Sequence, residues 1–170
     1  RLDGPEGHII SKQGTPTMGG FLILLGLSAG TVLWTDITNQ YVWACLIITT
    51  GFGLIGFMDD YYKITRASSD GVSGKMKLLM EVVVSVVAIL VILDKAEPEI
   101  GSQLAIPLFK DMLIDLGWFM VPFGVFMLVA SSNSVNLTDG LDGLAVMPVI
   151  IAAGTFALIA YLVGNVVFAN

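Results

Sequence analysis

The chain has 170 residues, of which 55% are hydrophobic and only 13% are charged, and its mean hydropathy is +0.85. These values lie far outside soluble globular usage and indicate an integral membrane protein. The formal net charge of −6 excludes the broad basic surface with which proteins bind nucleic acid. The single cysteine, Cys45, excludes a disulfide framework and a thiolate metal site, and we expect it to be a small buried residue.

Five apolar runs follow one another along the chain, each near the ~20 residues that a membrane-spanning helix needs. Backbone groups in lipid must be satisfied within their own segment, so we expect an all-α polytopic helical bundle whose polar ends extend the shorter runs. Residues 94–115 contain Pro98, Gly101 and Pro107 and are expected to form a small extramembrane hairpin or a re-entrant loop. Within one transmembrane domain over residues 1–170, the expected spans cover about residues 18–35, 41–58, 78–94, 116–132 and 144–163.

Five spans would place the N-terminal stretch, the 59–77 loop and the 133–143 stretch on one side of the membrane. This side carries most of the basic residues. Short loops rich in Lys and Arg stay cytoplasmic, so we expect every conspicuous polar motif to face the cytoplasm. The basic residues are Arg1, Lys12, Lys63, Arg66, Lys75 and Lys77 on this side, and Lys95 and Lys110 on the other.

The most conspicuous polar stretch, NSVNLTDGLDGLA, separates the fourth and fifth runs and carries Asn133, Asn136, Asp139 and Asp142 at every third position. Helical neighbours three apart share a face, but the repeat slips by about 60° per step, so the four cannot line one straight stripe. We therefore expect a loop leading into a helix, with the carboxylates turned toward a shared cavity. A polar connector with helix caps is the alternative, because Asn, Asp and Gly are common there.

The second apolar run ends in GFMDDYYK, where Asp59 and Asp60 are adjacent. Two neighbouring carboxylates repel each other, and a divalent cation would relieve this, since Mg²⁺ prefers one or two carboxylates plus phosphate oxygens. Neighbouring helical residues point about 100° apart, so we expect one aspartate to orient or bind metal and the other to act as a base. A solvated helix end is the alternative, although the helix dipole opposes carboxylates at a C-terminal end.

Two further stretches offer phosphate contacts. KQGTPTMGG begins with Lys12 and brings the Thr17 hydroxyl and several glycines to the expected start of a helix, where free N–H groups favour phosphate. An ordinary N-cap at Thr17 is the alternative. GKMKLL places Lys75 and Lys77 before the third run, where membrane anchoring explains at least one of them. Carboxylates that hold Mg²⁺ beside cations that hold phosphate suit phosphoryl transfer, and the membrane setting suggests a lipid substrate.

Three strings, which occur along the chain in the order KQGTPTMGG, GFMDDYYK and NSVNLTDGLDGLA and lie between these spans, closely resemble the phospho-N-acetylmuramoyl-pentapeptide-transferase (translocase I) family. This family belongs to the polyprenyl-phosphate N-acetylhexosamine-1-phosphate transferase superfamily. The resemblance runs from His8 to about Ala145. It implies transfer of phospho-MurNAc-pentapeptide from UDP-MurNAc-pentapeptide to undecaprenyl phosphate, giving lipid I and UMP with Mg²⁺ in peptidoglycan synthesis. It also implies a homodimer in the bacterial inner membrane whose active face is cytoplasmic.

By position, the resemblance implies that Asp59 is the base that deprotonates the lipid phosphate and that Asp60 is its partner near the metal. Asn136 and Asp139 match residues that line the catalytic centre, and Asp139 joins Asp60 as a metal ligand. These residues are compatible with direct attack by the lipid phosphate and also with a covalent enzyme intermediate.

Substrate contacts are implied at both ends of the resemblance. Lys12 and Thr17 match nucleotide-side contacts, and Lys77 matches a functional lysine, although Lys75 is close enough to confuse the match. The uridine pocket is matched by three consecutive residues, Gly140, Leu141 and Asp142.

One departure from the family limits what this chain would do alone. The family has a further span before this region, and it continues through later spans that carry another metal-site aspartate and a histidine-rich loop. The chain begins at Arg1 without a methionine and ends at Asn170 just after an apolar run. We therefore expect part of a longer protein that holds about half a site and is inactive by itself.

Two alternative functions stay open at this point. A related transferase for another UDP-N-acetylhexosamine would keep the aspartates and differ in its sugar pocket. A cation-binding membrane protein would need carboxylates within its spans, and only Glu81, which we expect near the membrane interface, comes close.

Overall fold

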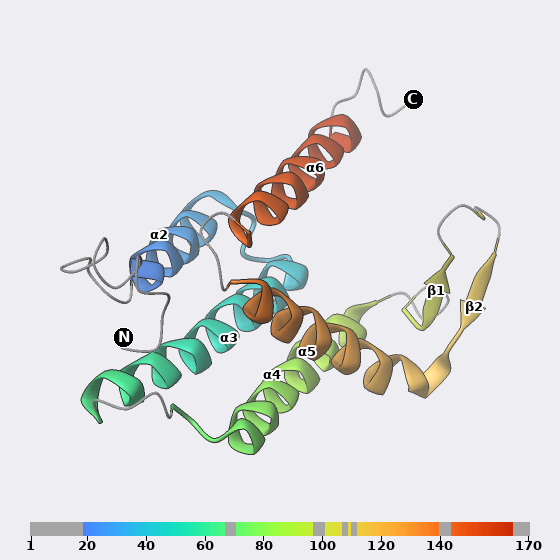
Figure 1. Ribbon diagram of the computed structural model, residues 1–170. Coiled ribbons are helices and arrows are strands. Elements are labelled where there is room, and N and C mark those ends of the chain that lie inside the picture. Colours follow the sequence, from blue (N-terminus) through green and yellow to red (C-terminus); the bar gives the residue numbers. More distant parts are fainter. Residues whose placement is uncertain are drawn as a thin grey trace. The chain divides into compact units, whose positions relative to one another are not determined.

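The computed structural model describes residues 19–66, 71–96, 101–106, 109, 112–139 and 144–164. Within these residues, five α-helices and a two-stranded sheet follow one another along the chain (Figure 1). The helices are α2 (Gly19–Trp34), α3 (Gln40–Thr65), α4 (Gly74–Lys95), α5 (Met120–Thr138) and α6 (Val146–Gly164). The strands are β1 (Gln103–Ala105) and β2 (Leu113–Asp115), and a 3-10 turn, η1 (Gly117–Phe119), leads into α5.

Four of the described helices are long and apolar enough to cross a membrane: α3, α4, α5 together with η1, and α6. Helix α2 is equally apolar in character but has only 16 residues. Each helix falls on one of the apolar runs, so the predicted all-α polytopic membrane fold is confirmed.

The helices continue past the apolar runs, and this changes the setting of two motifs. Helix α3 extends to Thr65, so Asp59 and Asp60 lie more than one turn before its end. Helix α5 extends to Thr138, so Asn133 and Asn136 are helical and the first turn residue is Asp139. The expected loop leading into a helix is therefore wrong for the two asparagines. No Gly or Pro interrupts the chain between them and Thr138, and a spanning helix keeps its backbone hydrogen bonds by continuing.

The chain divides into two compact units, Arg1–Val129 and Ala130–Asn170, which are described separately. In the first unit α3 packs along α4, and α2 contacts α3 (Figure 1). Gly51 allows close approach at the α3–α4 seam, because an added Cβ there would lie 2.6 Å from Val84 Cγ1. Small residues bring helix backbones together in membranes, where apolar burial alone drives no association.

Polar and apolar residues share the buried face of α4. Ser85 and Ala88 are 0% exposed and Glu81 is 2% exposed, at helical spacing that places all three on one side. Glu81 is thus buried within the first unit, and its position near the membrane interface stays a prediction. The expectation that Cys45 is buried is wrong, since it is exposed while its neighbours Ala44 and Leu46 are buried.

The expected hairpin is confirmed. Strands β1 and β2 are antiparallel, with Gln103 opposite Asp115 and Ala105 opposite Leu113. The Asp115 carboxylate accepts hydrogen bonds from Ser102 Oγ at 2.6 Å and from the Gly117 amide at 2.9 Å, and these lower the pKa of Asp115. Gly117 has a φ of 51°, a left-handed conformation that glycine adopts at little cost and that turns the chain into η1.

Candidate acidic site on helix α3

Five of the predicted site residues lie within the part of the chain that the structure describes. Asp59, Asp60 and Lys77 belong to the first unit, whereas Asn136 and Asp139 are exposed residues of the second. The other five fall outside the described residues, and they are Lys12, Thr17, Gly140, Leu141 and Asp142. The geometry of the site is therefore built from α2, α3, α4 and the segment that enters α4.

Asp59 is held by two hydrogen bonds. Lys63 Nζ, one helical turn further along α3, donates to Asp59 Oδ2 at 2.6 Å, and the Val72 amide donates to Oδ1 at 2.8 Å. The Asp59 and Lys63 side chains are 16% and 28% exposed, so the ion pair is partly shielded from water. An acid four residues before a base is the favourable order on a helix, and the pair offsets the unfavourable dipole at this end of α3.

The backbone at Gly71, where the described chain resumes before α4, lies against the same carboxylate. A Cβ added to Gly71 would overlap Asp59 Oδ1 and would lie 2.8 Å from both Asp59 Cγ and Lys63 Cε. On α4, Lys77 is near enough to interact electrostatically with Asp59, whereas Lys75 is exposed. Lys77 is also less exposed than Lys75, and which of the two lysines is functional stays a prediction.

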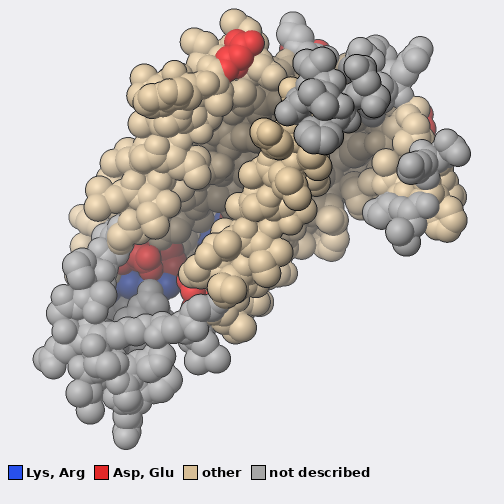
Figure 2. Space-filling view, turned by 90° about the horizontal axis from the view of Figure 1, so that it is seen from above, with Lys and Arg blue, Asp and Glu red and all other residues tan. Residues whose placement is uncertain are grey.

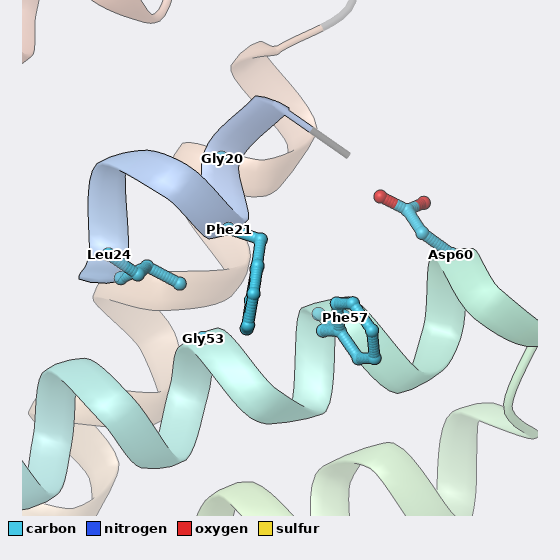
Figure 3. Close-up of a pocket in the computed structure, with 7 residues that line it drawn as sticks. Gly20, Phe21, Leu24, Gly53, Phe57 and Asp60 are labelled. Carbon is cyan, nitrogen blue, oxygen red and sulfur yellow. The ribbon is translucent and has the colours of Figure 1, made fainter. Parts of the chain in front are cut away.

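Asp60 has different surroundings. It lies at one end of a groove of about 160 Å³ between α2 and α3, and its carboxylate extends off α3 beyond the Phe57 ring (Figure 3). The Phe21 and Phe57 rings lie beside each other in the lining of the groove, tilted by 42° and with their centroids 5.2 Å apart. Small residues keep the groove open, and its lining consists of Gly20, Phe21, Leu24, Gly53, Gly56, Phe57 and Asp60.

The charges of this face are concentrated. In Figure 2, acidic and basic side chains lie side by side, while uncharged residues cover most of the remaining described surface in this view. Among the described residues, no three His, Cys, Asp or Glu side chains gather into a metal-binding group. Asp60 and Asp139 belong to different units, so their pairing as metal ligands stays a prediction.

Sequence reasoning did not assign a role to Lys63 or Gly71. The four-residue spacing of Asp59 and Lys63 within GFMDDYYK is a signal that would have indicated the ion pair. Gly71 has no comparable signal, because its approach to Asp59 depends on the path of the chain between α3 and α4.

Apolar helices of membrane-spanning length, one of which carries an acid–base pair near its C-terminal end, define a polytopic α-helical membrane protein. Residues 42–170 match glycosyl transferase family 4, and residues 12–24 match phospho-N-acetylmuramoyl-pentapeptide-transferase signature 1. The chain belongs to glycosyl transferase family 4.

Two curated relatives extend the match over the whole chain. It is 51% identical over 175 residues to the phospho-N-acetylmuramoyl-pentapeptide-transferase of Phenylobacterium zucineum (strain HLK1). It is 53% identical over 171 residues to the protein of the same name from Rhodopseudomonas palustris (strain BisB18). Each match covers 100% of this chain and 47% of the relative, so the chain spans about half the length of these relatives. The resemblance inferred from the motifs is confirmed.

Proposed function

We propose that the protein transfers phospho-MurNAc-pentapeptide from its UDP carrier to undecaprenyl phosphate, giving lipid I and UMP. The observation that carries the proposal is the identity of 51% and 53%, over the whole chain, to two proteins named for that transferred group. The signature match at residues 12–24 and the acid–base cluster around Asp59 support it. The protein would act in the bacterial inner membrane, with this cluster on the cytoplasmic face, as a homodimer.

In the proposed reaction an oxygen of the lipid phosphate attacks the phosphorus that carries MurNAc. The bond from that phosphorus to the bridging oxygen of the diphosphate breaks, and UMP leaves with that oxygen. Asp59 is proposed as the base that takes the proton of the lipid phosphate. Its two oxygens accept from Lys63 and Val72, and a carboxylate has about four lone-pair sites, so it is oriented and can still accept a proton.

The remaining site residues are proposed to bind the substrates. Lys77, which interacts with Asp59, would contact phosphate, and Asn136 would line the catalytic centre. The nucleotide would be bound by residues outside the described part of the chain, Lys12, Thr17, Gly140, Leu141 and Asp142.

The donor chemistry at the groove fits Mg²⁺, which is commonly bound by one or two carboxylates together with substrate phosphates. Asp60 meets this requirement, because its carboxylate extends from α3 at the end of a groove that begins beside Gly20 (Figure 3). We propose Asp60 and Asp139 as the ligands. The ion, when bound, would neutralise charge that develops on the diphosphate.

The test measures UMP release by the full-length protein in detergent with UDP-MurNAc-pentapeptide, undecaprenyl phosphate and Mg²⁺. Release should require both the lipid and the ion and should collapse in Asp59→Asn. Asp36→Asn is the matched control, because Asp36 lies in the connector between α2 and α3 and its carboxylate accepts hydrogen bonds from Thr38, two residues along the chain. Release with UDP-GlcNAc but not with UDP-MurNAc-pentapeptide would assign the protein to the related transferases for another UDP-N-acetylhexosamine. No release with either donor would overturn the proposal. The isolated 170-residue chain is expected to be inactive.

A further inference from the structure

We propose that Gly71 is a positioning residue that fixes the place of the Asp59 carboxylate. The absence of a side chain at Gly71 lets the backbone before α4 close directly onto that carboxylate. The consequence for catalysis rests on the proposed function, in which Asp59 is the base. The contact between Gly71 and Asp59 holds the carboxylate in place whatever reaction the protein catalyses.

Three groups enclose the carboxylate. Lys63 donates to one oxygen at 2.6 Å from within α3, and the Val72 amide donates to the other at 2.8 Å from 13 residues along the chain. The Gly71 backbone also lies against the carboxylate, since an added Cβ would overlap Asp59 Oδ1 and approach Asp59 Cγ to 2.8 Å. Hydrogen bonds of this length tolerate only small displacements before they weaken. A methyl group at position 71 must therefore move the carboxylate, the loop or both.

Gly71 differs from the other closely packed glycines that the structure describes. Added Cβ atoms at Gly51, Gly53 and Gly124 would meet apolar side chains only, namely those of Val84, Leu24 and Ile89. At Gly71 the groups met are the two members of an ion pair. Space for helix packing explains the first three glycines, whereas Gly71 leaves space for a charged group of the candidate site.

The same loop also sets the position of α4. Val72 is followed by Ser73, the N-cap of α4, and α4 carries Lys77, which interacts electrostatically with Asp59. A loop displaced at Gly71 would therefore move the amide donor and shift the start of the helix that bears Lys77. Misplacement of a reacting group by about 1 Å can lower a rate by about 100-fold.

The experiment compares Gly71→Ala with Gly74→Ala in the full-length protein. Gly74 is the first residue of α4, and a Cβ added there meets nothing within 4 Å, so it controls for a methyl group at this end of α4. Gly71→Ala should lower kcat for UMP release by about tenfold or more while leaving KM for the UDP donor nearly unchanged. Gly74→Ala should keep wild-type kcat. Wild-type kcat in Gly71→Ala would overturn the catalytic consequence.

A thermal-unfolding cycle tests the geometry without any activity. Gly71→Ala should lower the Tm of the wild-type protein but not that of Asp59→Ala, where the new methyl group can enter the vacated space. An equal loss of Tm in both backgrounds would mean that Gly71 serves the loop backbone rather than Asp59, and would overturn the proposal. If the cycle shows coupling while the wild-type protein releases no UMP from any donor, the proposed function fails and the role of Gly71 in placing Asp59 stands.

Discussion

Asp59 and Asp60 are adjacent on α3, yet Asp59 is bonded to Lys63 and Val72 whereas Asp60 lines the groove between α2 and α3. The divergence follows from the helix, which turns by about 100° between neighbouring residues. Asp59 faces the chain that enters α4, and Asp60 faces α2. The sequence predicts this difference in direction, and the different tasks of the two carboxylates stay a prediction.

Removal of the Asp59 carboxylate predicts a loss of stability. Asp59→Ala leaves the Val72 amide without its acceptor and Lys63 without its ion pair, and we expect the free energy of unfolding to fall by about 1–2 kcal/mol. Asp59→Asn keeps a side-chain oxygen that can accept from the Val72 amide, and it should cost less. Equilibrium unfolding of the two variants in mixed micelles checks the order, and a larger loss in Asp59→Asn would contradict it.

The α3–α4 seam predicts an asymmetry between two glycines of the same helix. A methyl group at Gly51 would lie 2.6 Å from Val84 Cγ1, and valine in a helix has one strongly preferred side-chain rotamer. Gly51→Ala should therefore destabilise the protein by about 1–3 kcal/mol through overpacking, against a helix-propensity gain of about 1 kcal/mol.

Gly56→Ala is the matched control, because a Cβ there meets nothing within 4 Å and the variant keeps the propensity gain. Its Tm should equal or exceed that of the wild type. Adding Val84→Ala to Gly51→Ala should recover part of the loss. No recovery would show that the loss does not arise from this contact.

The sequence predicts the number and order of the helices well, because apolar runs of spanning length allow little else in lipid. It predicts the ends of those helices less well. Asn133 and Asn136 belong to residue types that favour turns, but α5 runs through both, and the first Gly or Pro that follows them is Gly140. Local composition was outweighed by continuity of the helix.

The candidate site also contains contacts that the sequence predicts and contacts that it does not. The Asp59–Lys63 pair can be inferred from four-residue spacing, which a helix converts directly into contact. The Gly71 contact and the burial of Glu81 could not, because each depends on which neighbouring segment covers the residue. Spacing specifies neighbours within one helix, whereas partners across a loop or a seam require the packed structure.

Ser85 on the buried face of α4 predicts a neutral or stabilising substitution. Its side chain is 0% exposed, and within the described part of the chain its hydroxyl has no hydrogen-bond partner. Ser85→Ala removes that hydroxyl without orphaning another group, so the free energy of unfolding should stay constant or rise by up to about 1 kcal/mol. Ser85→Val adds volume to the seam and should lose about 1–3 kcal/mol. A clear loss in Ser85→Ala, measured by equilibrium unfolding, would contradict this account.

The hairpin predicts a local dependence on pH. Two hydrogen bonds hold the pKa of Asp115 below its ordinary value of about 3.9. The bond from the Ser102 hydroxyl has the larger effect, and the bond from the Gly117 amide has the smaller one. A carboxylate with a lowered folded-state pKa stabilises the fold fully above the ordinary pKa, and this contribution is lost as the pH falls through the folded-state value. The bonds between Asp115, Ser102 and Gly117 should therefore persist at neutral pH and weaken only in acid.

Carboxyl-carbon NMR titration of Ser102→Ala tests the cause of this shift. The variant should move the pKa of Asp115 upward toward the ordinary value, because the larger of the two hydrogen-bond effects is removed. Asp36 is the internal control, since its pKa is lowered by Thr38, whose hydroxyl donates to Asp36 Oδ1 at 2.6 Å. Ser102→Ala should leave the Asp36 titration unchanged, and Thr38→Ala should move Asp36 and leave Asp115 in place. A shift of both aspartates in either variant would indicate a change of the whole fold, because the two carboxylates have separate donors on separate connectors.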